Sequence, residues 1–149
     1  MKAQHGTLNF KEDGIYMVLS LPASVFDRAD EDNDNLLSMT EFSQQRTEII
    51  KTVTEFVTFT SKEQVYRLQN VLVSPVTPHD SPKAPAEQIV AMGKFVLTDK
   101  NQPLQFAVEL FGNNPEEHVL HITASKKSEN QKQKFELTPK AYKKELDIR

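Results

Sequence analysis

The two-residue period of a β-strand recurs along most of this chain. In residues 14–22, for example, Ile15, Met17 and Leu19 fall on one face. The segments rich in β-branched and aromatic residues are TLNF (7–10), IYMVLSLP (15–22), FVTFTS (56–61), VYRLQNVLV (65–73), QIVAMGKFVL (88–97), LQFAVELF (104–111), HVLHITAS (118–125) and KFELT (134–138). Because about seven or eight such segments alternate with turn sequences, we expect an antiparallel β-sandwich.

A helical period replaces the strand period in one region only. Pro22 and Ser24 are typical of a helix start, and SVFDRA then predicts a short helix that runs into an acidic stretch. After that stretch, apolar residues recur at helical spacings. They are Phe42, Ile49, Ile50, Val53 and Phe56. We therefore expect one domain over residues 1–149, with a helix-loop-helix inserted between strands at residues 22–55.

Composition excludes several classes of function. The chain has 149 residues, a net charge of −3 and no cysteine, so disulfides, thiolate metal sites and a cysteine nucleophile are ruled out. A net charge of this sign does not indicate a basic surface for nucleic acid. No apolar run approaches the roughly 18 to 20 residues that cross a bilayer. We expect neither nucleic-acid binding nor direct membrane insertion of this chain.

The acidic stretch DEDNDNLLSMTE, residues 30–41, has oxygen atoms at the spacing of a calcium-binding loop. Such a loop supplies ligands from positions 1, 3, 5, 7 and 9 and a bidentate glutamate from position 12. These positions are filled by Asp30, Asp32, Asp34, Leu36 through its backbone carbonyl, Ser38 and Glu41. Registers that start at Asp27 or Asp32 leave the ligand set incomplete. The stretch therefore predicts a site for one Ca²⁺ ion, the alternative being a solvated acidic connector.

The residues around these ligands carry a resemblance to a known family. Phe26 and Phe42 flank the loop, and Leu37 occupies its apolar eighth position. Over residues 24–53 the sequence resembles the EF-hand family, which implies calcium as the bound ion. Asn35 replaces the usual glycine at position 6, and asparagine tolerates positive φ at a cost of about 1 kcal/mol or less. We expect weakened calcium binding.

The order of segments along the whole chain resembles a more particular group of proteins. A short strand after HG, a strand ending in SLP, the loop region FDRADEDNDNLLSMTEF and a final ELTP segment are shared features. The chain is similar to bacterial extracytoplasmic Ig-like domains that precede the membrane regions of nickel permeases of the hydrogenase and urease accessory type. This resemblance implies a periplasmic, calcium-bearing Ig-like module whose partner is a protein or an adjoining membrane domain.

The remaining chemically active side chains do not predict an enzyme. His118 and His121 are three apart in a predicted strand, so they face opposite sides and are not expected to chelate one ion. The string HDS at residues 79–81 invites a triad interpretation, but triads require convergence of separate segments. His5 could join a metal site with the amino end, and a disordered tail is the alternative. There is no phosphate-binding glycine loop, HExxH or GxSxG motif.

Two classes of function remain open. In the first, calcium stabilises a structural or interaction module. In the second, the chain is a calcium-responsive regulatory domain of a membrane-associated transport or metal-homeostasis protein. Sensor EF-hands open a methionine-rich groove, whereas the four methionines here are scattered through the sequence. The sequence therefore favours the structural module.

Overall fold

The computed structural model describes residues 4–29, 39–61, 64–76, 88–97, 103–111 and 117–146. The strands are β1 (His5–Lys11), β2 (Gly14–Pro22), β3 (Val57–Ser61), β4 (Gln64–Arg67), β5 (Gln69–Val76), β6 (Gln88–Phe95), β7 (Leu104–Val108), β8 (Leu120–Lys126), β9 (Gln131–Leu137) and β10 (Lys143–Leu146). The helical elements are η1 (Ala23–Ala29), α1 (Met39–Phe56) and η3 (Lys127–Glu129). The prediction of a mostly β fold is confirmed.

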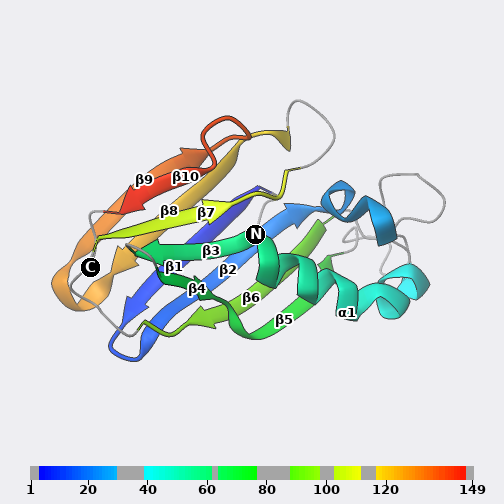
Figure 1. The fold of residues 1–149 in the computed structure, drawn as a ribbon, viewed down its shortest axis with the longest axis horizontal. Coiled ribbons are helices and arrows are strands. Elements are labelled where there is room, and N and C mark those ends of the chain that lie inside the picture. Colours follow the sequence, from blue (N-terminus) through cyan, green and yellow to red (C-terminus); the bar gives the residue numbers. More distant parts are fainter. Residues whose placement is uncertain are drawn as a thin grey trace.

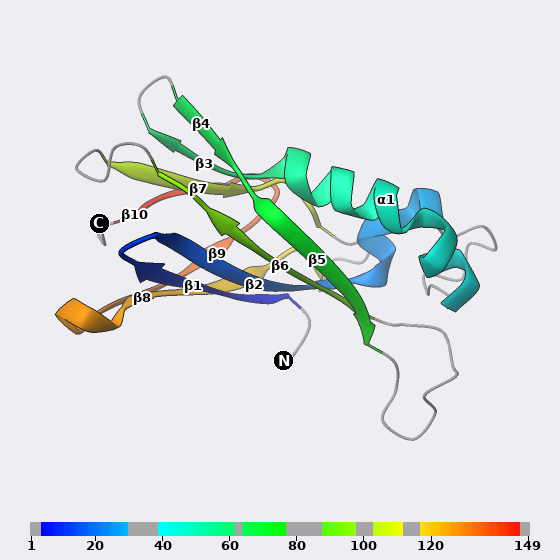
Figure 2. The same ribbon diagram turned by 90° about the horizontal axis from the view of Figure 1, so that it is seen from below.

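The strands form two sheets that enclose the core between them (Figures 1 and 2). One sheet has six strands in the order β5-β6-β2-β1-β8-β9, and the other has four in the order β10-β7-β3-β4. In chain order, η1 and α1 fall between β2 and β3. Figure 2 shows α1 along one side of this sandwich-like arrangement, and it contacts both β5 and β3.

One strand pair differs from the predicted antiparallel arrangement. β1 lies parallel to β8, with His5 opposite His121 and Asn9 opposite Ser125. All the other strand pairs in the described ranges are antiparallel. A parallel pair requires a long connection, and most of the chain lies between these two strands. The prediction of a wholly antiparallel fold is therefore wrong at this pair.

The segment VYRLQNVLV, predicted as one strand, is divided between the two sheets. β4 lies at the edge of the four-stranded sheet and β5 at the edge of the six-stranded sheet. Leu68, the residue between β4 and β5, is buried. At the start of β5, Asn70 has a φ of 55°, and the pairing with β6 shifts between Gln69 and Leu72. Asparagine tolerates this left-handed conformation better than most residues. The irregular backbone therefore lets the chain pass from one layer to the other.

The centre of the core is aromatic. Phe59 in β3 is fully buried, and its ring lies 4.8 Å from that of Phe95 and 4.9 Å from that of Phe106, measured between centroids. Phe10 approaches it edge-on at 6.4 Å. These four rings come from β1, β3, β6 and β7, so they join the two sheets.

The C-terminal region contains a hairpin and a strand that was not predicted. The lysine-rich sequence after β8 forms the tip of the hairpin, with η3 followed by Asn130 at a φ of 52°. β10 was not predicted, because KKEL has a single apolar residue and no visible alternation. That residue, Leu146, is fully buried, and β10 pairs with β7.

The turn between β1 and β2 is tied to β6 by a carboxylate. Tyr16 donates a hydrogen bond of 2.7 Å to Asp13 Oδ2, and Lys94 Nζ lies 3.0 Å from the same oxygen. The hydrogen bond from Tyr16 and the contact with Lys94 lower the pKa of Asp13 from 3.8 to about 2. Because folding lowers this pKa, the carboxylate stabilises the fold above pH 3.8, and that contribution is lost as the pH falls toward about 2.

We expect Tyr16→Phe to move the pKa of Asp13 back toward 3.8, because it removes the hydrogen bond that is the largest single cause of the lowered pKa. An NMR titration of the Asp13 side-chain carboxyl carbon measures this pKa directly. Lys94→Gln should shift the pKa in the same direction, because it removes the positive charge beside Asp13. If the pKa of Asp13 were the same in Tyr16→Phe and the unmodified protein, the assignment of this hydrogen bond would be wrong.

Candidate metal centre

The predicted calcium ligands divide between two parts of the chain. Asp30, Asp32, Asp34, Leu36 and Ser38 lie outside the residues that the structure describes. Glu41, the predicted bidentate ligand, lies in the first turn of α1. The structure therefore describes one predicted ligand and the two helical segments that flank the loop.

The segment that enters the loop is helical, as predicted, but it is not a regular α-helix. η1 is a 3₁₀ helix with a kink at Phe26, where φ is −107° and ψ is 50°. The backbone is tighter than in an α-helix, and 3₁₀ segments of this kind are short. α1, which leaves the loop, is an 18-residue α-helix. The flanking helices are thus unequal in type and length.

Both flanking segments are fixed to the core by phenylalanine. Phe26 and Phe42 are buried, and the guanidinium carbon of Arg46 lies 5.1 Å from the Phe42 ring centroid. Further along α1, Ile49 and Val53 are also buried and share the face of Phe42. η1 and α1 contact each other and lie at the same end of the molecule (Figure 1). The described segments that precede and follow residues 30–38 are therefore in contact with each other.

Glu41 has a position and charge suited to a cation ligand. Only 7% of the residue is exposed, although a carboxylate is normally found in water. Its place in the first turn of α1 is favourable, because the helix dipole stabilises negative charge there. The side chain is engaged in a polar interaction within the protein. Burial of an ionised carboxylate is costly unless it is paired or bound to a metal, so Glu41 fits the role of a hard oxygen ligand.

A hydrogen bond ties η1 to a distant part of the chain. Ser24 Oγ donates to Glu117 Oε1 at 2.8 Å, and Ser24 is buried. Glu117 directly precedes the segment that leads into β8. Glu117 is only partly exposed, and Glu116 lies outside the described residues. The sequence around Glu117 gives no local signal of this contact, since Ser24 is far away in the chain.

A groove of about 630 Å³ runs beside the same helices. Its apolar lining comes from Val25 and Phe26 of η1, Ile49 and Phe56 of α1, and Leu110 after β7. Glu48, Glu55 and Lys51 add charge along α1. Phe56 is 37% exposed, so part of this apolar surface is open to water.

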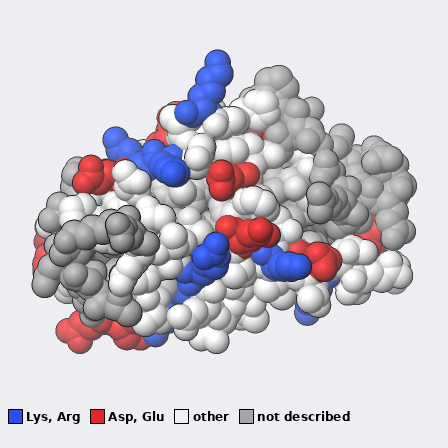
Figure 3. Space-filling view, in the orientation of Figure 1, with Lys and Arg blue, Asp and Glu red and all other residues white. Residues whose placement is uncertain are grey.

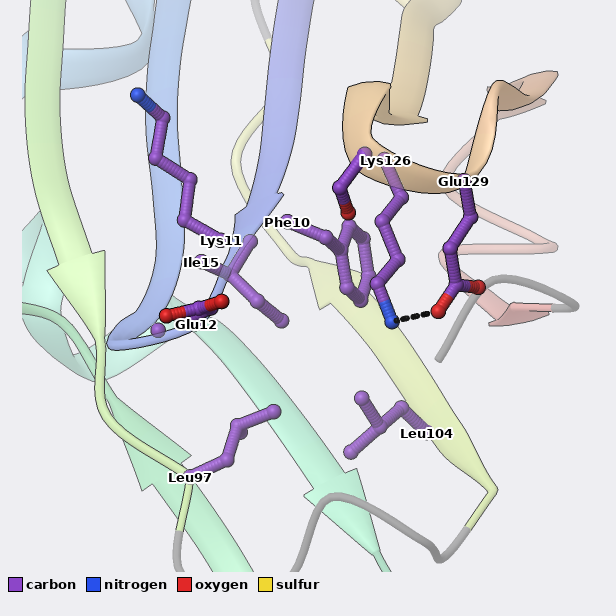
Figure 4. Close-up of a pocket in the computed structure, with 10 residues that line it drawn as sticks. Phe10, Lys11, Glu12, Ile15, Leu97, Leu104, Lys126 and Glu129 are labelled. Carbon is purple, nitrogen blue, oxygen red and sulfur yellow. Dashed lines mark ion pairs between the residues drawn. The ribbon is translucent and has the colours of Figure 1, made fainter.

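A second cavity, of about 490 Å³, lies where β1, β2, β7 and η3 approach one another (Figure 4). Its apolar lining is formed by Phe10, Ile15, Leu97 and Leu104. At its rim Lys126 Nζ lies 3.1 Å from Glu129 Oε1, so the positive charge is already paired. We did not predict this cavity, because its residues come from separate segments without a shared motif.

Other clusters add no further metal centre of three or more ligands. In the ranges that the structure describes, no group of three or more histidine, aspartate or glutamate side chains is arranged to hold a metal ion. Figure 3 shows positive and negative side chains interspersed over one face of the molecule. His79 lies outside the described residues, and His118 precedes β8 instead of lying within it.

Comparisons with known proteins assign no relatives. No family model matches the chain, and no curated protein matches it. Among the described helices, none has the length and apolar character needed to span a membrane. The function is therefore inferred from the residues of this chain and their geometry.

Proposed function

We propose that this chain is a calcium-binding structural or interaction module, in which residues 30–41 form a single EF-hand loop that holds one Ca²⁺ ion. The observation that carries the proposal is the buried Glu41 carboxylate in the first turn of α1, at the twelfth position of the predicted loop. The proposed ligands before it are Asp30, Asp32, Asp34, Leu36 and Ser38. With Glu31, residues 30–41 carry five carboxylates, which repel one another in so short a segment, and a bound dication relieves that repulsion.

The structural role follows from how α1 is attached. α1 contacts β3 in one sheet and β5 in the other, and its buried residues belong to the common core. An ion bound at its first turn would stabilise a helix that joins both layers. The proposal includes an Ig-like β-sandwich in an extracytoplasmic setting, where millimolar calcium would compensate for the weakening by Asn35. Its partner would be a protein or an adjoining membrane domain.

A calcium-responsive regulator is the second candidate, and the groove beside α1 favours it. The groove lies between η1 and α1, the two segments joined by the loop. A change in their angle on calcium binding would alter the exposure of Phe26 and Phe56. The two candidates differ in one observable: a regulator changes its exposed apolar surface with calcium, whereas a structural module changes mainly in stability.

The first test is a thermal melt in chelator, in millimolar calcium and in millimolar magnesium. At 100 times the dissociation constant, one site on the native state adds about 2.7 kcal/mol, which is a rise of about 5 to 10 °C for a domain of this size. We expect this rise with calcium and a much smaller one with magnesium, because magnesium demands octahedral geometry and keeps its waters.

Two variants on the same helix provide the matched comparison. Glu41→Gln removes a charged ligand oxygen and should abolish the calcium-dependent rise, whereas Glu48→Gln changes an exposed carboxylate on α1 and should retain it. Binding of a fluorescent apolar dye, measured with and without calcium, then separates regulator from structural module. If calcium left the melting temperature of the unmodified protein unchanged, both candidate functions would be wrong.

A further inference from the structure

Two histidines far apart in the sequence are neighbours on the outer face of the six-stranded sheet. His5 in β1 and His121 in β8 are opposite each other in the parallel pair. Their rings are stacked, with centroids 4.9 Å apart and planes inclined by 25°. The expectation of a disordered tail at His5 is wrong, because β1 begins at this residue. The two imidazoles lie side by side as a stack. Because the lone pair of a ring nitrogen lies in the ring plane, both rings must turn out of this stack to bind one ion.

The backbone beneath this pair is fixed on both sides. The His121 amide donates a hydrogen bond of 2.8 Å to the Gln4 carbonyl, and the Gln4 amide donates one of 2.7 Å to the Ser20 carbonyl. His5 is also opposite Ser20 in the antiparallel pairing of β1 with β2. The two histidines thus project from neighbouring strands of one hydrogen-bonded sheet. A ligand that binds both rings would lose little free energy in ordering the backbone, because the sheet already holds the two strands together.

A carboxylate continues the same row across the sheet. Glu136 in β9 is opposite His121, and its Oε1 lies 3.7 Å from His121 Nδ1. This distance exceeds a hydrogen bond, but an ion bound at Nε2 would leave the Nδ1–H group facing this carboxylate. Histidines that bind metals usually have such a carboxylate or carbonyl beside the other ring nitrogen. His121 and Glu136 have side chains that are 48% and 61% exposed, so an ion from solution can reach them.

We propose that His5 and His121 form a two-histidine site for a divalent transition-metal ion, with Glu136 as a positioning residue and water completing the coordination. Imidazole nitrogen suits Cu²⁺, Ni²⁺ and Zn²⁺, whereas Ca²⁺ and Mg²⁺ take oxygen ligands. Among these ions Cu²⁺ binds nitrogen ligands most tightly. The site is separate in chemistry from the calcium loop and does not depend on it.

The test is titration of the folded chain with Cu²⁺ by calorimetry, with electron paramagnetic resonance of the bound ion. We expect one strong site per chain with two imidazole nitrogens as ligands. His121→Gln and His5→Gln should each weaken binding by more than tenfold, and Glu136→Gln by about tenfold, the lower end of the usual effect of such a partner. His118→Gln is the matched control, because His118 precedes β8 and should leave the affinity unchanged.

Two results would overturn the proposal. If His5→Gln weakened binding and His121→Gln did not, copper would be held by His5 with the amino end alone. Equal losses in His118→Gln and His121→Gln would indicate adventitious binding. A measurement on the unmodified protein avoids dependence on variants: with diamagnetic Zn²⁺, the ring resonances of His5 and His121 should shift together while those of His118 stay in place.

Discussion

Replacement of Phe59 by alanine is expected to lower the free energy of unfolding by about 3 to 5 kcal/mol. Phe59 is fully buried and contacts the rings of Phe95 and Phe106 at centroid distances of 4.8 and 4.9 Å. Removal of its ring leaves a cavity between the sheets and also removes the edge-to-face contact with Phe95 and the tilted contact with Phe106. Urea unfolding followed by far-ultraviolet circular dichroism, at a fixed calcium concentration, measures the loss.

Phe56→Ala is the matched control for this substitution. Phe56 ends α1 just before β3, and it is 37% exposed. The same atoms are removed, but from a side chain that is partly in water, so we expect a loss of about 1 kcal/mol. Similar losses in the two variants would contradict the assignment of Phe59 to the centre of the core.

The strand period in the sequence was sufficient to locate most of the sheet. Residues such as Leu8, Phe10 and Phe59 alternate with polar neighbours, and they are buried in the structure. This succeeds because one face of each strand must lie against the core, whatever its partner strand. The same argument located α1 from the spacing of Phe42, Ile49 and Val53.

The partners of each strand could not be obtained in the same way. Nothing within HGTLNFK or LHITASK indicates that β1 and β8 pair in parallel, because a local period carries no information on the neighbour. VYRLQNVLV likewise has a continuous strand composition, and only Asn70 hints at the change of sheet. Pairing is decided by long-range packing, which a single sequence does not state.

The two metal sites illustrate this difference. The predicted calcium loop is contiguous, so its ligand spacing could be found by counting along residues 30–41, and all six of its ligands, Glu41 included, remain predictions. The histidine site could not be found by counting. His5 and His121 meet only through the parallel pairing, and Glu136 joins them through the pairing of β8 with β9.

The proposed histidine site and η1, which precedes the predicted calcium loop, lie in the same region of the fold. Ser20, opposite His5, is close in sequence to η1, and the hydrogen bond from Ser24 to Glu117 joins η1 to the segment before β8. Because the ions differ in ligand preference, calcium should not displace copper from imidazole. The pairing of β1 with β2 holds this region together. A change that destabilises the hairpin of β1 and β2 is therefore expected to affect both proposed sites.

Gly14→Ala is expected to destabilise the protein by about 3 to 5 kcal/mol. Gly14 begins β2 with a φ of 147°, a conformation that residues with a side chain rarely adopt. A Cβ atom there would also lie 2.3 Å from the backbone carbonyl oxygen of Phe95 in β6. A backbone oxygen in a paired strand cannot rotate away, so β2 and β6 must separate locally. The loss is measured as the fall in the urea midpoint.

Gly6→Ala tests whether the backbone is the cause. Gly6 lies in β1 of the same hairpin, and a Cβ there would meet the ends of two side chains, Leu19 Cδ1 at 2.8 Å and Ile122 Cδ1 at 2.9 Å. Side-chain ends can adjust by rotation, so we expect a loss of about 1 to 2 kcal/mol. If Gly6→Ala were as damaging as Gly14→Ala, general overpacking of the hairpin would explain both results. A clearly larger loss at Gly14 would instead show that the φ of this residue and the close approach of β6 fix the turn.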